Sequence, residues 1–282
     1  MKKTIDPQID HEVLSLITNI SYSCVPAWYG GTRRNLKMDM IAPKNRTRNR
    51  KLPLIVWFCG GGFRVVDRAI WLPEMMHFAR NGYIVASVEY RTCNEEAFPG
   101  ALIDAKAAIR YLKAHAEDYC IDPERICVMG ESAGGTLASL AALTGGIEEF
   151  EQGDFLEVDS SVNAVIDFYG SVDLVNVTVQ SAGRDVPPWL LQDFLGIDYT
   201  EDTAAKASAV SYVSEKTPPV LIFHGSSDTT VPIAQSERFY EELQKNHVDS
   251  SFYVLNGAGH GEDCFYQEQT WEIMDDFLKR VL

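Results

Sequence analysis

The stretch MGESAGG at residues 129–135 contains a serine at the centre of a G-x-S-x-G pattern. Gly130 and Gly134 lack the Cβ atoms that would clash in a sharp turn from a strand into a helix. Such a turn would expose Ser132 and put the N–H of Ala133 at a helix start, where developing negative charge is stabilised. Because glycine and serine are common, the pattern alone does not establish a nucleophile. Ser132 is therefore a candidate whose partners the rest of the chain must supply.

A serine hydroxyl needs a base to take its proton, and histidine commonly does this. Of the six histidines, His11, His77 and His115 precede the serine. His224 ends an apolar run and is expected to hold a loop, and His247 fits the C-terminal cap of a helix. The remaining histidine, His260, lies in the glycine-lined loop NGAGHG after the last expected strand. Elimination leaves His260 as the candidate base.

The base in turn needs a carboxylate that orients it and stabilises its charged form. Asp228 lies in LIFHGSSDTTVP, in the turn after an apolar run that predicts a buried strand. Asp173 in FYGSVDL also follows a strand and is the alternative acid. The chain order Ser132, Asp228, His260 is that of the α/β-hydrolases, and other classes of serine hydrolase use other orders.

The glycine run in WFCGGGF, residues 57–63, follows a β-branched and aromatic segment. Successive glycines let backbone N–H groups face a tetrahedral oxyanion without obstruction by side chains. A phosphate-binding loop is the alternative, but the segment lacks the lysine and the spacing of a nucleotide-binding loop. The expected oxyanion donors are the N–H groups of Gly61, Gly62 and Ala133.

Short apolar runs alternate with helical patterns, which predicts an α/β fold with a mostly parallel central sheet and helices on both faces. The expected strands span residues 36–41, 54–58, 84–90, 126–129, 164–169, 220–224 and 251–255. The expected helices span residues 99–116, 133–143 and 267–282, and the second begins directly after the serine.

No repeat, low-complexity segment or linker divides the chain, so we expect a single domain over residues 1–282. The least regular region spans residues 171–213 and includes GRDVPPWLLQDFLG. We expect a small cap-like insertion over a substrate pocket there, and a packed connector is the alternative.

The formal net charge is −15, which argues against nucleic acid as a partner because binding to phosphates needs a basic face. The sequence contains no apolar segment long enough for a secretion signal or a membrane span. Six cysteines without C-x-x-C spacing suggest neither a metal site nor a disulfide framework. We therefore expect a cytoplasmic protein, without a membrane partner, whose chemistry requires no cofactor.

Together these segments resemble the α/β-hydrolase esterases related to hormone-sensitive lipase, especially the branch of bifunctional acetyl and feruloyl esterases. The resemblance covers most of the chain, from NLKMDMIAPK through LPLIVWFCGGGF, FPGALIDAKAAIRYL, IDPERICVMGESAGG and PPVLIFHGSSDTTVP to GAGHG. The family usually has a histidine where this chain has Cys59, and the acetyl/feruloyl branch usually has a tryptophan at Phe63. Because the oxyanion donors are backbone groups, the change at Cys59 should spare them and alter only the support of their loop.

By this likeness Asp104 and Asp122 belong to the scaffold, and Glu131 is structural or tunes the site by its charge. The resemblance also suggests aromatic pocket walls, with core packing as the alternative for each. These residues are Phe63, Trp71, Trp189 and Phe194.

The expected function is that of a serine carboxylic ester hydrolase that forms an acyl-enzyme with small acyl groups, such as acetyl or feruloyl groups on carbohydrate. An aryl formamidase or a small-peptide hydrolase is the alternative, because the same groups cleave amides when the leaving nitrogen is protonated. A non-catalytic ligand receptor on a hydrolase scaffold is a remote third hypothesis. A homodimer is compatible with the sequence, although no residue pattern requires one.

Overall fold

The computed structural model describes residues 1–8, 12–27, 30–176, 180–181, 184–185 and 188–282, and it describes side chains outside 177–190. Its centre is an eight-stranded sheet in the order β1-β2-β4-β3-β5-β6-β9-β10. The strands are β1 (Leu14–Ala27), β2 (Thr32–Pro43), β3 (Leu52–Phe58), β4 (Ile84–Val88), β5 (Ile121–Glu131), β6 (Ala164–Phe168), β9 (Val220–Gly225) and β10 (Ser250–Leu255). β2 is antiparallel to β1 and β4, and every other neighbouring pair is parallel. The predicted mostly parallel sheet is confirmed.

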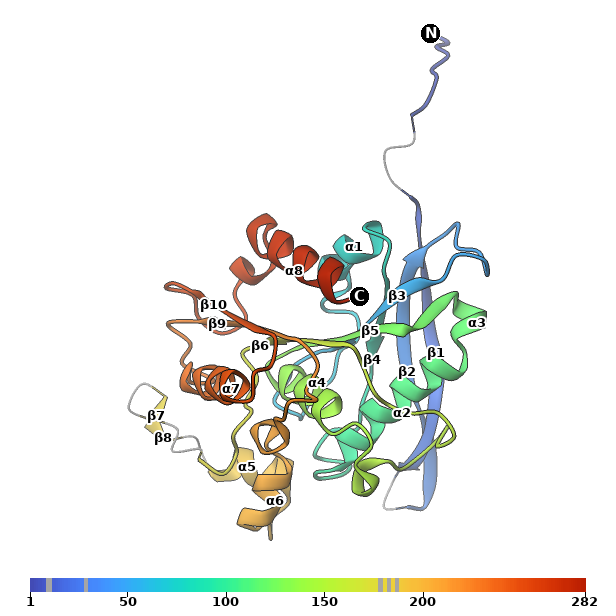
Figure 1. Ribbon diagram of the computed structural model, residues 1–282. Coiled ribbons are helices and arrows are strands. Elements are labelled where there is room, and N and C mark those ends of the chain that lie inside the picture. Colours follow the sequence, from blue (N-terminus) through green and yellow to red (C-terminus); the bar gives the residue numbers. More distant parts are fainter. Residues whose placement is uncertain (9–11, 28–29, 177–179, 182–183, 186–187) are drawn as a thin grey trace.

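Helices cover both faces of this sheet (Figure 1). α1 (Leu72–Arg80) and α8 (Glu268–Val281) lie on one face, and α2 (Gly100–Ala114), α4 (Ala133–Leu143) and α7 (Ala234–Lys245) lie on the other. Alternate side chains of β3 pack against the helices on opposite faces of the sheet, because successive residues of a strand point to opposite faces. Val56 packs with the layer of α2 and α4, and Trp57 packs with that of α1 and α8. Among the described residues, the shorter helices are α3 (Ala116–Tyr119), α5 (Pro188–Leu195), α6 (Glu201–Lys206) and the 3₁₀ turns at Glu148–Phe150, Ala209–Tyr212 and Asp263–Tyr266.

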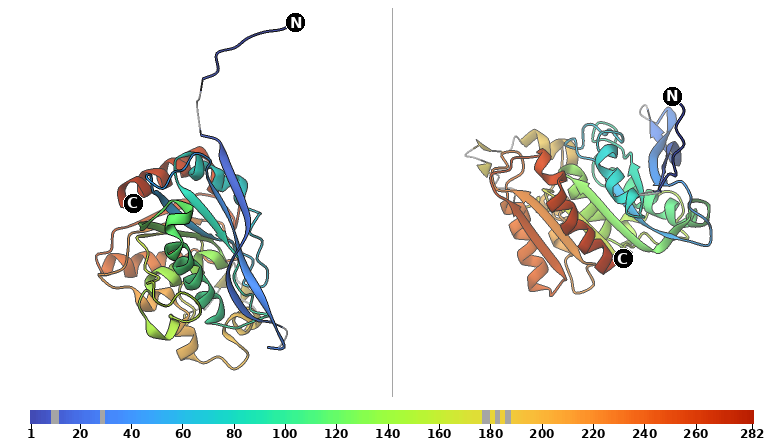
Figure 2. Two further views of the ribbon diagram at one scale, coloured as in Figure 1. Left: turned by 90° about the vertical axis from the view of Figure 1, so that its right-hand side faces the viewer. Right: turned by 90° about the horizontal axis from the view of Figure 1, so that it is seen from above.

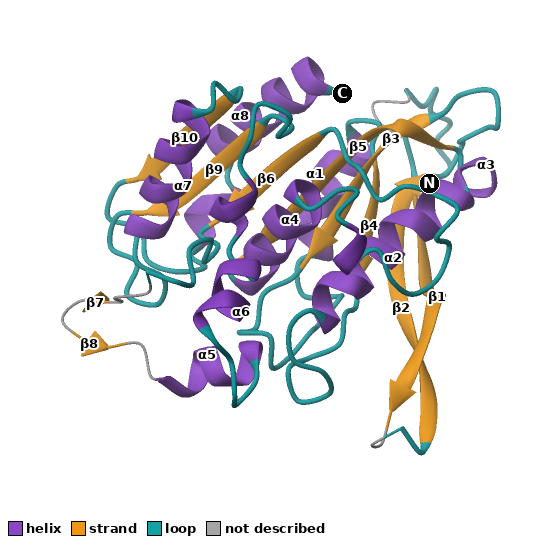
Figure 3. Ribbon diagram, turned by 60° about the horizontal axis from the view of Figure 1, so that its bottom comes forward, coloured by secondary structure: helices purple, strands orange, loops and turns teal. Residues whose placement is uncertain are grey.

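The first strand is absent from the expectations, which begin at residue 36. β1 pairs with β2 over its whole length, but its register shifts between Ile17 and Ile20 and again between Ser21 and Ser23. These irregularities break the alternation of apolar and polar residues by which a strand is identified in a sequence. Figure 3 shows the two strands as a long twisted ribbon, and Figure 2 shows this edge opposite the edge formed by β10.

The loops at the carboxyl ends of the parallel strands position the candidate site. β3 leads into the glycine run, β5 into the serine turn, β9 into the segment with Asp228 and β10 into the loop with His260. In an open parallel sheet these ends share one edge, so residues far apart in the sequence meet there.

Residues 171–213 contain α5, α6 and the two-stranded pair β7 (Gln180–Ser181) and β8 (Arg184–Asp185). Residues 177–179, 182–183 and 186–187 of the expected cap lie outside the described residues. α5 is joined to the rest of the chain at its end, where the Phe98 N–H donates to the Phe194 carbonyl at 2.7 Å.

Candidate active site

Ser132 occupies the sharp turn between β5 and α4. Its φ is 55° and its ψ is −122°, a backbone conformation that residues other than glycine seldom adopt. Hydrogen bonds to its N–H and to its carbonyl hold this conformation. The Ser132 N–H donates to the Phe168 carbonyl at 2.9 Å, and its carbonyl accepts from the Thr136 N–H at 3.0 Å. A Cβ on Gly134 would lie 1.9 Å from the Phe58 carbonyl oxygen, so only glycine lets α4 pass this close to β3. The turn thus presents the serine hydroxyl at the carboxyl edge of the sheet.

The loop after β10 brings an imidazole to this hydroxyl. His260 Nε2 lies 2.9 Å from Ser132 Oγ, and His260 Nδ1 lies 2.7 Å from Asp228 Oδ2. A carboxylate only accepts hydrogen bonds, so Nδ1 carries the proton and Nε2 is free to accept one from the serine. The ring of Tyr169 lies against the imidazole with its centroid 4.5 Å away. The three predicted residues therefore form one hydrogen-bonded chain.

Asp228 is held as the ionised acceptor of this chain. Its Oδ1 accepts the backbone N–H groups of Thr230 and Val231 at 2.7 and 2.9 Å, and its side chain is fully buried. Burial alone would raise the pKa of Asp228, but hydrogen bonds from His224 and His260 outweigh burial and hold that pKa well below its usual range. His224 also supports this carboxylate, because its Nε2 lies 3.4 Å from Asp228 Oδ2 as well as 2.9 Å from the Val231 carbonyl oxygen.

The alternative acid, Asp173, is engaged elsewhere. Its carboxylate accepts the backbone and side-chain N–H groups of Asn176 at 3.0 Å, and it lies 3.6 Å from Arg238. Among the other histidines, His77 contacts Asp275 and Asn81, and His11 lies outside the described residues. The structure thus joins Asp228, and not Asp173, to the imidazole.

The three expected oxyanion donors, Gly61, Gly62 and Ala133, line the same cavity as Ser132. Gly61 and Gly62 follow β3 with φ values of 128° and 60°, and Ala133 is the first residue of α4. In the described part of the chain, none of these three N–H groups donates a hydrogen bond. A Cβ on Gly61 would lie 2.3 Å from the Val65 carbonyl oxygen, so the loop requires glycine there. The arrangement leaves donors available to an oxyanion.

The serine opens into a cavity of about 480 Å³ with a mainly apolar wall. The wall consists of Gly61, Gly62, Phe63, Glu131, Ser132, Ala133, Thr136, Ser171, Leu174, Leu191, Phe194, Thr230, Val231, Pro232, Gln235 and His260. Phe63 and Phe194, two of the four expected aromatic residues, lie in this wall. Their rings stack with centroids 3.8 Å apart.

The other two aromatic residues have different positions. Trp71 is not part of this wall, because its indole packs on Tyr266 and its Nε1 donates to Glu131 at 3.2 Å. The side chain of Trp189 lies outside the described residues. Sequence reasoning missed Leu174 and Gln235, which no local pattern distinguishes from core residues.

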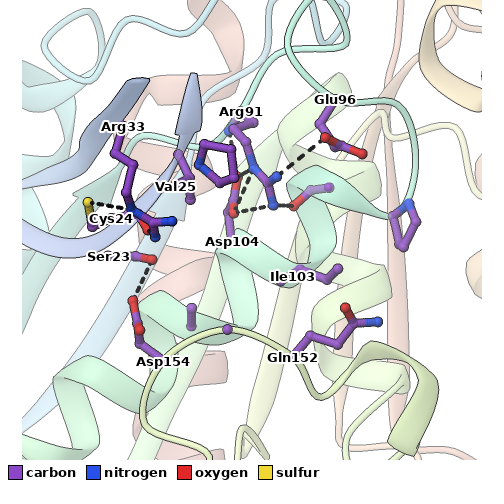
Figure 4. Close-up of a pocket in the computed structure, with 15 residues that line it drawn as sticks. Ser23, Cys24, Val25, Arg33, Arg91, Glu96, Ile103, Asp104, Gln152 and Asp154 are labelled. Atoms are coloured by element: carbon purple, nitrogen blue, oxygen red, sulfur yellow. Dashed lines mark hydrogen bonds and ion pairs between the residues drawn. The ribbon is translucent and has the colours of Figure 1, made fainter. Parts of the chain in front are cut away.

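A second cavity, also of about 480 Å³, lies between the β1–β2 hairpin, the start of α2 and residues 152–154 (Figure 4). Its charged groups have partners within its own wall. Arg91 makes an ion pair with Asp104 at 2.9 Å, and Asp154 accepts from the Ser23 hydroxyl at 2.7 Å. Arg33 donates to the Cys24 carbonyl, and Glu96 lies 3.6 Å from Arg91. These contacts join the segment after β4 to α2 and join β1 to the loop with Asp154. They fit the scaffold role expected of Asp104.

Among the described residues, no group of three or more His, Cys, Asp and Glu side chains is arranged to hold a metal ion. In the same part of the chain, no helix is both long and apolar enough to cross a membrane. The six cysteines are free thiols, and burial raises the pKa of Cys59 to about 12.

The sheet, the serine turn and the order of the loops define the α/β-hydrolase fold. The chain belongs to the BD-FAE family, whose model matches residues 38–243, and the resemblance inferred from the sequence is confirmed. It is 35% identical to the probable carboxylic ester hydrolase LipM of Mycobacterium tuberculosis over 77% of this chain. The chain spans 51% of the length of LipM.

Solved structures of other proteins are also similar to this chain. A thermophilic esterase of Thermogutta terrifontis, Est2 with butyrate bound, is 28% identical, with a TM-score of 0.76 over 88% of this chain and 90% of that one. A bifunctional GH43-CE protein of Bacteroides eggerthii is 25% identical, with a TM-score of 0.80 over 94% of this chain and 35% of that one.

Proposed function

We propose that this chain is a serine carboxylic ester hydrolase acting on esters of small acyl groups, with acetylated or feruloylated carbohydrate as the substrate class. The observation that carries the proposal is the hydrogen-bonded chain from Asp228 through His260 to Ser132, which faces a cavity with unpaired N–H donors. Membership of the BD-FAE family and similarity to curated ester hydrolases support the same activity.

In the proposed reaction, Ser132 Oγ attacks the acyl carbon while His260 Nε2 takes the hydroxyl proton. The N–H groups of Gly61, Gly62 and Ala133 bind the oxygen that becomes negative. Nε2 then gives its proton to the departing alcohol as the bond between the acyl carbon and the alcohol oxygen breaks. Water, deprotonated by the same nitrogen, then attacks the acyl-enzyme. The bond between the acyl carbon and Ser132 Oγ breaks, Oγ takes the proton back from Nε2, and the acid leaves.

The wall of the cavity supports a small or flat acyl group. A volume of about 480 Å³ lies within the range of small-molecule sites, and Phe63, Leu174, Leu191 and Phe194 provide apolar contacts without a charge. Est2, a related esterase, binds butyrate, which favours short acyl chains here. An aromatic acyl group such as ferulate is the alternative that the stacked rings favour.

Residues 171–213 act in this proposal as a cap-like insertion of a single domain. Ser171, Leu174, Leu191 and Phe194 come from this segment and border the cavity. The cap therefore determines which acyl or alcohol groups fit, whereas the loops of the sheet perform the reaction.

The test compares initial rates on p-nitrophenyl esters of increasing chain length for wild type and Ser132→Ala. We expect activity on acetate to butyrate and a loss of about 10⁴-fold or more in the variant, because the nucleophile is removed. Ser139→Ala is the control, since Ser139 is a buried serine within α4 that does not line the cavity. Anilide substrates test the aryl formamidase and peptidase alternative. A folded wild type without activity on any ester would contradict the proposal.

A further inference from the structure

The proposed oxyanion donors belong to two backbone segments of different rigidity. Ala133 is the first residue of α4, whose helical hydrogen bonds hold its backbone. Gly61 and Gly62 lie in a run of three glycines, and glycine allows many backbone orientations. A donor contributes only when it already points at the place where the negative charge forms. Other groups must therefore hold the glycine segment in position.

The peptide unit between Cys59 and Gly60 is held at both of its polar atoms. The Tyr90 hydroxyl donates to the Cys59 carbonyl oxygen at 2.6 Å, and the Gly60 N–H donates to the Glu131 carboxylate. Because a peptide unit is planar, its C=O and N–H lie on opposite edges of one rigid plate. Two hydrogen bonds at opposite edges fix the rotation of this plate, and Gly61 and Gly62 continue the chain directly from it.

Both side chains that hold the peptide are themselves immobilised. Tyr90 is fully buried and its ring packs edge-on against Phe63, which follows the glycines. Glu131 is 8% exposed, and the oxygen that accepts the Gly60 N–H also accepts Trp71 Nε1 at 3.2 Å. A Cβ on Gly60 would lie 2.5 Å from this oxygen, so the carboxylate lies directly against the backbone.

Glu131 also connects the two parts of the proposed machinery. It is the last residue of β5 and immediately precedes Ser132, so its backbone leads into the serine turn while its carboxylate holds the glycine loop. A shift of the loop relative to the serine would therefore strain the hydrogen bond at Gly60.

We propose that Tyr90 and Glu131 are positioning residues that clamp the Cys59–Gly60 peptide and so orient the N–H groups of Gly61 and Gly62 toward the oxyanion. The inference rests on the proposed hydrolase function and adds two residues to it. Both clamp contacts are made to the main chain of Cys59 and Gly60, and the buried Cys59 thiol takes no part in them. The clamp thus holds a loop in which this chain lacks the histidine usual for its family.

The first test is Tyr90→Phe, which removes one hydroxyl and keeps the ring. We expect kcat to fall about tenfold with KM changed less than about threefold, because donors that act on the transition state lose their alignment. The matched control is Tyr22→Phe, since Tyr22 is also buried and its hydroxyl donates to a backbone carbonyl, that of Glu89, at 2.5 Å. Equal kcat values in the two variants would overturn the role of Tyr90.

The second test compares Glu131→Gln with Glu131→Ala. A glutamine oxygen can accept both the Gly60 and the Trp71 N–H, so we expect Glu131→Gln to keep kcat within about fivefold of wild type. Glu131→Ala loses both bonds, and we expect kcat to fall about 100-fold. Equal losses in the two variants would show that the charge matters and not the acceptor, and would overturn the clamp. If Glu131→Ala does not fold, Tyr90→Phe and Glu131→Gln still decide.

A further readout separates failure of the clamp from failure of the proposed function. The rate at which a fluorophosphonate labels Ser132 depends on the oxyanion donors even where no ester is turned over. Wild-type labelling without ester hydrolysis would contradict the proposed substrates, and the variants would still report on the clamp. Wild-type hydrolysis with unchanged labelling in Tyr90→Phe and Glu131→Ala would overturn the clamp alone.

Discussion

The two cavities have the same volume, about 480 Å³, and opposite electrostatic arrangements. At the β1–β2 hairpin each charged side chain has a partner in the wall, as Arg91 has in Asp104. At the carboxyl edge of the sheet the wall is mainly apolar, and the donors of Gly61, Gly62 and Ala133 have no acceptor among the described residues. Unpaired donors cost stability unless a ligand satisfies them. The contrast supports the proposal that the second cavity binds a substrate, whereas the contacts in the wall of the first join elements of the fold.

The largest expected effect tests the catalytic side of this contrast. In Asp228→Asn the backbone N–H groups of Thr230 and Val231 require the amide oxygen at the Oδ1 position. The NH₂ group then faces His260 Nδ1 and donates to it, which moves the imidazole proton to Nε2. An Nε2–H cannot take the proton of Ser132, so we expect kcat to fall about 10⁴-fold. Steady-state kinetics on p-nitrophenyl acetate measure this.

The control for that change is Asp154→Asn, which alters an aspartate of the other cavity. Its carboxylate accepts from Ser23, and an amide oxygen can do the same, so the rate should stay within about twofold of wild type. A loss below tenfold in Asp228→Asn would contradict its assigned role.

The next largest effect concerns the stability of the protein and the cavity at the β1–β2 hairpin. Asp104→Asn removes the main counter-charge of the Arg91 guanidinium, which is mostly shielded from solvent. We expect the free energy of unfolding to fall by about 3 to 5 kcal/mol, because breaking a buried ion pair leaves an uncompensated charge. Urea unfolding measures the loss, and kcat per folded molecule should stay unchanged. A large fall in kcat with unchanged stability would overturn the contrast between the cavities.

A smaller, pH-dependent effect is expected beneath the serine turn. Asp167 is fully buried on β6, its Oδ1 accepts the Gly170 N–H at 3.0 Å, and burial raises its pKa to about 6. The unfolded state loses this proton near pH 4, so the native state is progressively destabilised as the pH rises from about 4 to 6. Asp167→Asn removes that dependence. Relative to wild type, the variant should gain up to about 3 kcal/mol between pH 4 and pH 7.

Thermal unfolding of both proteins across this pH range measures the difference, because all other titrating groups are shared. A constant difference between the two melting curves would contradict a raised pKa at Asp167. A difference that shrinks toward pH 7 would show that the shift has the opposite sign.

Most of the sheet was predictable, because its strands are short, apolar and buried on both faces. The expected helix at 133–143 has the same bounds as α4, because the glycine turn before it and the apolar residues within it both favour a helix that starts there. β1 was missed because its shifted register hides the alternation. Trp71, for which core packing was the alternative to a pocket wall, packs on Tyr266. An aromatic residue near a site can equally pack behind it, and only its neighbours decide.

The sequence by itself determined the candidate residues of the proposed catalytic chain, because each lies in a short local pattern whose turn geometry depends on adjacent residues. Only the tertiary structure decided that Asp228 and not Asp173 reaches His260, and that Leu174 and Gln235 border the cavity. It alone placed Tyr90 and Glu131 on the two edges of one peptide. Such contacts join residues dozens of positions apart and depend on strand register and helix packing, which no local pattern records.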